Sequence, residues 1–139
     1  MNLTSKQVEG DFLAMLQGSS LATELSGGIY RQGLRPRDSN LEDAVVVFTA
    51  GRSDEIQSGV VTIVVFVPDV APYGNGVFVE DGARVEQLQG LASEWVQSLD
   101  ASKSNYRIRL ENTITSHNEE ESKQHFISVV LRYDYYDNQ

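Results

Sequence analysis

The stretch that decides the fold is GVVTIVVFV, residues 59–67, in which valine, isoleucine and phenylalanine follow one another almost without a break. A run of β-branched and aromatic residues of this length is typical of a strand. Residues 44–49, AVVVFT, have the same character, and the polar residues 51–55 between the two runs fit a hairpin connection. Because both strands are apolar at consecutive positions, we expect helices to cover one face of their sheet and a partner surface to cover the other.

Helical periodicity flanks this strand pair. In residues 83–99 apolar side chains recur at the 3.6-residue spacing of a helix with one buried face, and Trp95 lies on that face. The same spacing recurs in residues 5–17, where Thr4 and Gln7 have the separation of an N-terminal capping box. We therefore expect two helices packed on the sheet, with Trp95 largely buried.

Shorter signals complete the order of elements. Residues 28–31 are β-prone and lead into a loop at Arg35-Pro36, which indicates an edge strand. In residues 106–111 apolar and polar side chains alternate as in a half-buried strand. The polar residues 116–123 predict a turn. Residues 126–136 then form a strand long enough to pair with residues 106–111. The sequence predicts an α+β fold in the order α-β-β-β-α-β-β. Its single domain, residues 1–139, would have one mainly antiparallel or mixed sheet with two helices packed on it.

A long loop precedes the second helix. Proline, glycine and asparagine punctuate residues 68–82, and loops of this length are usually functional or mobile. Asp81, near the end of the loop, is placed to cap the following helix. The segment Gly74-Asn75-Gly76 begins like a dinucleotide-binding fingerprint, but Val79 stands where the third glycine belongs. We interpret the segment as a flexible turn.

Composition excludes several classes of function. The chain has no cysteine, so disulfides, thiolate metal sites and a cysteine nucleophile are excluded. Its 20 acidic and 11 basic residues give a net charge of −9, which disfavours specific binding to nucleic acid. The longest apolar run, residues 60–67, is far shorter than the roughly 20 residues that cross a bilayer, and residues 1–10 lack the apolar core of a secretory signal. We expect a soluble, intracellular protein without membrane contact.

Candidate chemistry is sparse. The two histidines, His117 and His125, flank acidic residues 119–121, and we interpret them as solvent-facing side chains rather than metal ligands. Ser53 lacks the second glycine of a nucleophile elbow. The sequence thus predicts no enzyme, no catalytic residue, no metal and no cofactor.

Two clusters are candidates for a subunit interface. The first is the one basic cluster of this acidic chain, Arg31, Arg35 and Arg37. It could bind a phosphate or carboxylate, pair with nearby acids at positions 38, 42 and 43, or form a head-to-tail contact between identical subunits. Pairing within the subunit is the reading we favour. The second cluster is formed by Tyr133, Tyr135 and Tyr136 near the C-terminus.

The arrangement of these elements resembles the tail terminator or tail completion proteins of long-tailed bacteriophages and prophages. The resemblance is carried by the N-terminal helix, Gly28-Ile29-Tyr30 leading to Arg35-Pro36, residues 42–47, the strand ending at Val67-Pro68-Asp69, and the strand pair after the Trp95 helix. It implies a virion assembly protein that forms a homo-oligomeric ring, commonly a hexamer, at the end of the tail tube. Such a ring stops tube growth and joins the head connector, first in the bacterial cytoplasm and then in the virion tail.

Two other functions remain open on the sequence. The loop at residues 68–82 could serve as a lid in a small-ligand binder or enzyme. Alternatively, the acidic chain could be a binding domain for a basic protein partner.

Overall fold

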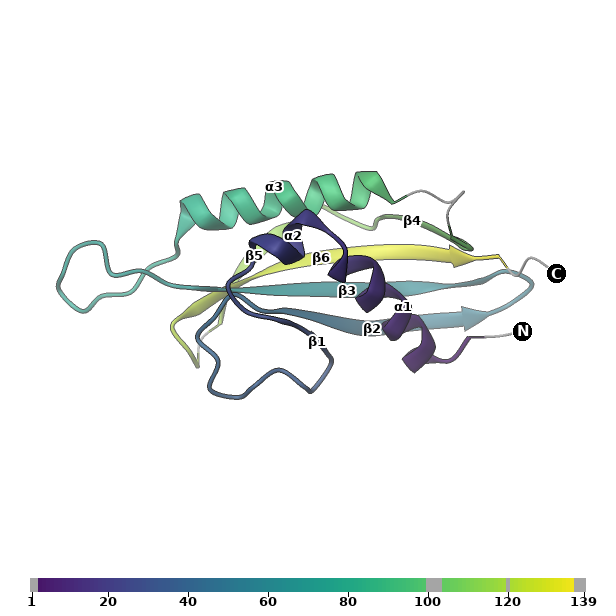
Figure 1. Cartoon of the computed structure of the whole chain (residues 1–139), viewed down its shortest axis with the longest axis horizontal. Helices are drawn as coiled ribbons and strands as arrows, with labels where there is room; N and C mark the ends of the chain where they lie inside the picture. The colour runs from purple at the N-terminus through teal and green to yellow at the C-terminus, as the bar shows by residue number, and fades with distance from the viewer. Residues whose placement is uncertain (1–2, 100–103, 120, 137–139) are drawn as a thin grey trace.

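The described part of the protein forms a six-stranded sheet with its helices packed on one face (Figure 1). The structure, a computed structural model, describes residues 3–99, 104–119 and 121–136. The elements in chain order are α1 (Ser5–Gln17), α2 (Ser20–Glu24), β1 (Ile29–Arg31), β2 (Ala44–Ser53), β3 (Gln57–Pro68), α3 (Gly82–Ser98), β4 (Tyr106–Leu110), β5 (Thr115–Glu119) and β6 (Gln124–Tyr135). The predicted α+β class is confirmed.

The sheet is mixed, with the strand order β1-β2-β3-β6-β4. The edge strand β1 runs parallel to β2, and the other pairings are antiparallel. Both β4 and β5 pair with the side of β6 that faces away from β3: β4 aligns with Leu131–Tyr135 and β5 with Gln124–Ser128. Together they act as one edge strand interrupted at residues 111–114.

Strand β5 corrects one sequence expectation. The polar residues 116–123 were expected to form a turn, whereas residues 115–119 are a strand and the chain reverses only afterwards. This strand lies at the edge of the sheet and buries none of its side chains, so its backbone pairs with β6 without any apolar alternation. Strands β2 and β3 are also longer than expected, because their polar ends continue the ladder from Gly51↔Gly59 to Ser53↔Gln57.

Capping fixes where the two long helices begin. The Thr4 side chain accepts a hydrogen bond from the Gln7 amide, and the Gln7 side chain accepts one from the Thr4 amide, so the expected capping box is confirmed. Asp81 caps α3 by accepting from the Arg84 amide, also as expected.

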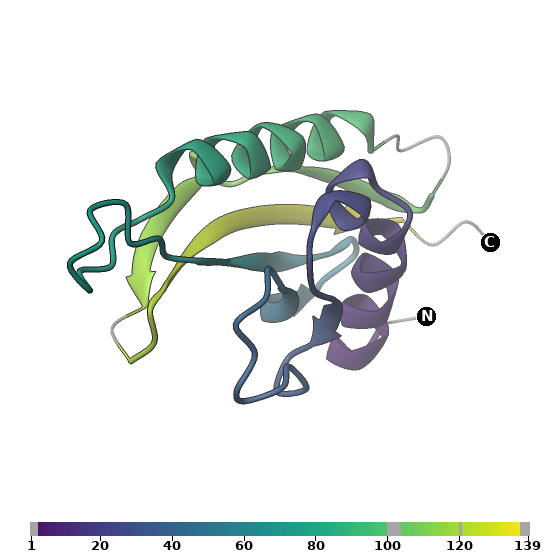
Figure 2. The same cartoon turned by 60° about the vertical axis from the view of Figure 1, so that its left-hand side comes forward.

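The core lies between the helices and one face of the sheet. Alternate residues of β3 and β6, including Ile63 and Val129, are fully buried beneath Phe12 of α1 and Leu88 of α3. Trp95 is 5% exposed and donates its indole N–H to the Met15 carbonyl at 3.4 Å, which confirms its expected burial. The sheet curves around these helices (Figure 2). No helix in the described ranges is long and apolar enough to cross a membrane.

Candidate assembly surface

The face of the sheet opposite the helices presents apolar side chains. On β3, Val60, Val64 and Phe66 alternate with the core residues and are half-buried, and Val47 of β2 and Val130 of β6 are half-buried on the same face. These strands are thus apolar on both faces at most positions, with a hydrogen bond between Thr49 and Thr62 on this one. That a partner surface covers this face stays a prediction. The helices of the described chain all pack on the other face. We call this surface the open face.

A hollow of about 280 Å³ lies on the open face at the start of β2 and the end of β3. It is lined by Gly33, Arg35, Val45, Val47, Val64 and Phe66. Its walls are mainly apolar, and its one charged group is the guanidinium of Arg35, whose central carbon lies 3.8 Å from the centroid of the Phe66 ring. This geometry is a cation–π contact, which holds Arg35 against the sheet. We call this feature the β2–β3 hollow.

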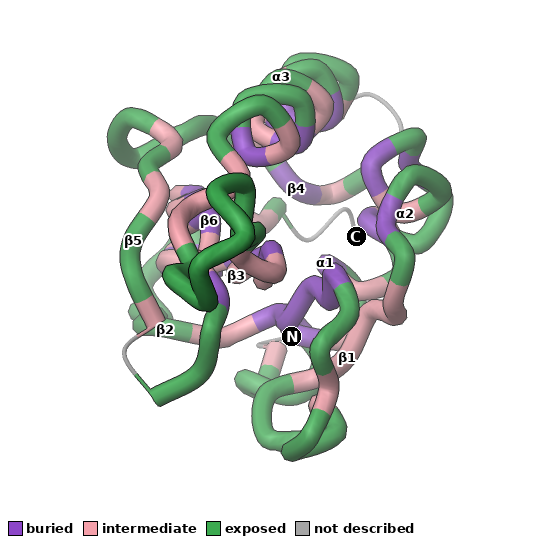
Figure 3. The backbone as a smooth tube through the Cα atoms, turned by 90° about the vertical axis from the view of Figure 1, so that its left-hand side faces the viewer, coloured by how far each residue is buried: buried purple, intermediate pink, exposed green. Residues whose placement is uncertain are grey.

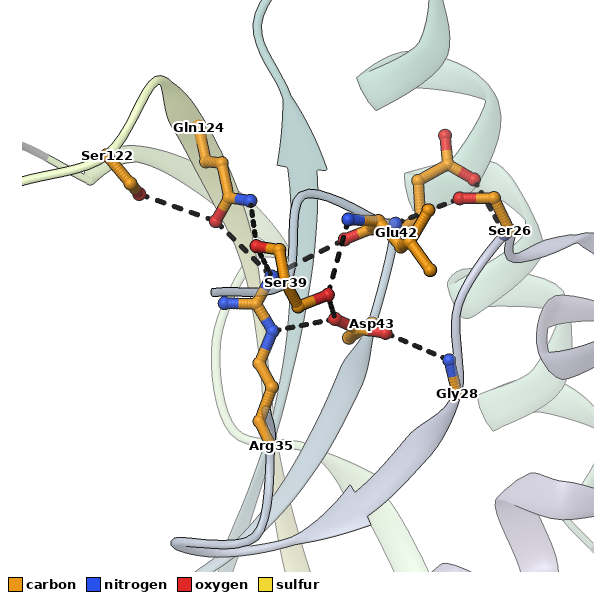
Figure 4. A network of polar contacts seen from close by, with 9 residues as sticks. Ser26, Gly28, Arg35, Ser39, Glu42, Asp43, Ser122 and Gln124 are labelled. Carbon is orange, nitrogen blue, oxygen red and sulfur yellow. Dashed lines mark hydrogen bonds and ion pairs between the residues drawn. The ribbon is translucent and has the colours of Figure 1, made fainter. Parts of the chain in front are cut away.

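A buried network fixes the far side of the Arg35 guanidinium (Figure 4). Arg35 Nε donates to Asp43 Oδ2 at 2.8 Å, and its Nη2 donates to Gln124 Oε1 at 3.3 Å. Asp43 is fully buried and also accepts from the Ser39 hydroxyl and, at 2.9 Å, from the Gly28 amide. Arg35 therefore joins the segment after β1 to the starts of β2 and β6.

The carboxylate of Asp43 stays ionised inside this network. Burial raises the pKa of Asp43, but hydrogen bonds from Ser39, Gly28 and Arg35 outweigh it and hold the pKa below its ordinary value. The backbone at position 27 passes so close to the Asp43 carboxylate that only glycine fits there, since an added Cβ would lie 1.9 Å from Asp43 Oδ1.

A second ion pair lies beside the first. Arg84 donates two hydrogen bonds to the Glu42 carboxylate, from Nε at 2.6 Å and from Nη2 at 2.7 Å. Its Nη1 donates to Glu24 Oε1 at 2.9 Å. The hydrogen bond from Arg84 lowers the pKa of Glu42. This bidentate pair fastens the start of α3 to the segment before β2. Residue spacing could not predict this pair, because Arg84 and Glu42 lie far apart along the chain.

The three arginines of the basic cluster have different surroundings. Pairing within the subunit is confirmed for Arg35, whose partner Asp43 was one of the acids expected. Arg31 instead contacts Glu9 of α1, with Nη1 3.2 Å from Oε1, and Glu9 is only 1% exposed. Arg37 is exposed and forms no ion pair with any residue in the described ranges. Of the three, Arg37 is the one whose charge is available to a neighbouring subunit.

The C-terminal tyrosines are divided between core and surface. Tyr133 is fully buried, with its ring centroid 5.8 Å from that of Phe12 and 5.7 Å from that of Tyr106. Tyr135 is half-buried, 5.0 Å from Tyr106. Tyr136 is 36% exposed, which leaves it as the tyrosine of the three with most surface to offer a partner.

The two histidines lie on neighbouring strands without forming a common site. His117 is exposed on β5, with Nε2 2.9 Å from the Thr115 hydroxyl. His125 was expected to face solvent but is half-buried on β6, because its Nδ1 lies 2.7 Å from Oδ1 of Asp69, just after the end of β3. Within residues 3–99, 104–119 and 121–136, no three histidine or acidic side chains are grouped so that they could hold a metal ion.

The loop between β3 and α3, residues 69–81, extends beyond the end of the sheet (Figure 1). Its stem is closed by two hydrogen bonds of 2.9 Å between the backbones of Val70 and Val79. Its tip turns through Gly74 and Gly76, which have φ angles of 66° and 78°. The tip is exposed along its whole length (Figure 3). We call residues 69–81 the projecting loop.

The projecting loop exposes several large apolar side chains. Their exposed fractions are 38% for Val70, 74% for Tyr73, 51% for Val77 and 41% for Phe78. Apolar side chains gathered on a protruding segment are typical of a protein interaction site. The sequence predicted a loop here, but its punctuation by proline and glycine did not reveal that the apolar residues would remain in solvent.

No protein-family model matches this chain, and no curated protein matches it significantly. Twenty chains of solved structures are similar to this one, and one of them is similar over 96% of this chain and 97% of its own length, at 15% sequence identity and a TM-score of 0.49. The function is therefore inferred from the surface itself.

Proposed function

We propose that this protein is a structural subunit that assembles with copies of itself into a ring, as the tail terminator proteins of long-tailed phages do. The observation that supports this proposal best is the open face, where apolar side chains of β2, β3 and β6 lie opposite the helix-covered core. Apolar surface of this kind gains free energy when a partner removes it from water. A ring subunit has such a partner in its neighbour.

The size of the β2–β3 hollow favours assembly over the binding of a small ligand. Its volume of about 280 Å³ is at the lower limit of small-molecule sites, which span roughly 300–1,000 Å³. Its mainly apolar lining has one charged group, and that group is already held by Asp43. A hollow of this kind is better matched to one or two apolar side chains of another protein.

Electron microscopy tests the proposed role on tail tubes. Purified protein is mixed with tail tubes from the phage or prophage that carries the gene, and with tubes that already bear their own terminator as a control. We expect closed rings on one end of the bare tubes and none on the capped tubes. Bare tube ends that remain unoccupied at saturating protein concentration would contradict a role in tail termination.

A further inference from the structure

We propose that the projecting loop of one copy docks into the β2–β3 hollow of the next copy. This inference rests on the proposed function and names its contact. The chain carries both halves of an apolar contact on different parts of its surface: a protrusion bearing Tyr73, Val77 and Phe78, and a hollow walled by Val47 and Val64. Two different patches of one chain that meet form a head-to-tail contact, and such contacts repeat around a ring.

Charge complements shape in this contact. Residues 69–81 carry three acids and no base; Asp69 is held by His125 and Asp81 caps α3, which leaves Glu80 without a described ion pair. The segment that borders the hollow, residues 31–37, carries three arginines and no acid. Arg31 and Arg35 are held by Glu9 and Asp43, so within the described ranges Arg37 is the arginine of this segment free to meet a charge on a neighbour. Arg35 lines the hollow itself, and Arg37 stands exposed two residues further along. Glu80 of the loop is therefore attracted to the exposed Arg37 at the border of the hollow.

The loop is long enough to reach a neighbour. Eight residues, 71–78, lie beyond the bridge between Val70 and Val79 and turn through Gly74 and Gly76. The loop extends past the end of its own sheet instead of lying on the open face (Figure 2). Its own hollow would be covered only if the loop turned back, as a lid does.

Disulfide trapping distinguishes a loop that docks on a neighbouring copy from a loop that covers its own hollow. The chain has no cysteine of its own, so introduced cysteines can pair only with each other. A variant with Tyr73→Cys in the loop and Val47→Cys in the hollow is oxidised and analysed on a non-reducing gel. We expect a ladder of covalent oligomers that ends at a fixed size, the size of the closed ring. The control pairs Tyr73→Cys with Leu110→Cys, an exposed position on β4, and should give no such ladder.

Each other outcome of the trapping is decisive. A fast-migrating monomer with an internal disulfide would show that the loop covers its own hollow, which overturns the inference in favour of a lid. No cross-link in a variant that still sediments as an oligomer would overturn the loop contact and leave the proposed ring intact. A parent chain that fails to assemble, alone or on tail tubes, would contradict the proposed function and the inference together.

A mixing experiment tests the head-to-tail geometry independently. One variant loses the loop anchors through Tyr73→Ser and Phe78→Ser, and the other blocks the hollow through Val47→Glu. Each alone should assemble at least tenfold more weakly than the parent. When the two are mixed, the intact loop of the hollow variant can enter the intact hollow of the loop variant. We therefore expect a 1:1 heterodimer that grows no further, because its remaining loop and hollow are both altered. If mixing restores no complex, the contact is not between loop and hollow. Should Val47→Glu fail to fold, Arg37→Glu replaces it at the border of the hollow.

Discussion

Asp43 joins three separate parts of the chain through one carboxylate. It accepts hydrogen bonds from the amide of Gly28 before β1 and from the side chains of Arg35 and Ser39 in the following loop. Removal of one partner of a buried ion pair leaves the other charge uncompensated. The arginine that borders the β2–β3 hollow is therefore held by a structural pair, and its substitution cannot serve as a pure test of assembly.

We expect Asp43→Ala to lower the free energy of unfolding by roughly 3–5 kcal/mol, because it strands the largely buried guanidinium of Arg35. Urea denaturation of parent and variant measures the difference. The matched control is Arg37→Ala, which removes an exposed arginine and should change stability by less than about 0.5 kcal/mol. Equal effects of the two substitutions would contradict the different roles assigned to Arg35 and Arg37.

Acid should weaken the fold through Asp43 and Glu42. Both have a pKa that is lower in the folded chain than its ordinary value, so the folded chain binds fewer protons than the unfolded chain as the pH falls. Their contribution is therefore fully present above the ordinary carboxyl pKa of about 4 and is lost as the pH falls below it. Urea midpoints measured from pH 7 to pH 2.5 should show this loss, and Asp43→Asn should reduce it. An unchanged pH dependence in the variant would contradict the assignment.

At the scale of elements, α3 depends on Trp95. The indole lies in the core at 5% exposure and donates to the Met15 carbonyl of α1, so Trp95→Ala should cost roughly 3–5 kcal/mol of stability. Thermal or urea unfolding measures the loss. Gln97, on the exposed side of the same helix, provides the control, and Gln97→Ala should be nearly neutral. A cost below 1 kcal/mol for Trp95→Ala would contradict the packing of α3.

The projecting loop should show two regimes of hydrogen exchange. In a monomer, we expect the amides of Tyr73 to Phe78 to exchange rapidly, because no described backbone bond of the sheet protects them, and the paired amides of Val70 and Val79 to exchange more slowly. In the assembled protein the tip should become protected. Uniformly slow exchange across residues 69–81 in a demonstrated monomer would show that the loop is an internal element of the subunit.

Periodicity in the sequence predicted the helices and strands that have a buried apolar face. It missed the polar edge strand and the contacts that form only in the folded chain. The helix periodicity around Trp95 and the apolar runs of β2 and β3 identified the layers, because burial selects apolar residues at regular spacing. Strand β5 was missed, since a polar edge strand is held by its backbone and leaves no such pattern. The pair of Arg84 with Glu42 and the exposure of Phe78 depend on tertiary structure, which residue spacing does not encode.

At the scale of the whole molecule, charge should control assembly. If the acidic loop meets the arginine border of the hollow, raising the salt concentration screens the attraction and weakens association. Arg37→Glu should weaken association at low salt and reduce its dependence on salt, while far-ultraviolet circular dichroism and melting remain those of the parent. Association that strengthens with salt in both proteins would indicate that apolar contact alone drives assembly.

Sedimentation velocity of the parent chain over a wide range of concentration tests the central claim most directly. The claim is that the open face and projecting loop are covered by further copies of this chain. We predict that one discrete oligomer replaces the monomer as concentration rises, with no larger species beyond it, because a closed ring leaves no free contact. A single sedimenting species with the mass of one 15.4 kDa chain at every concentration, in low salt and in the presence of tail tubes, would contradict the account.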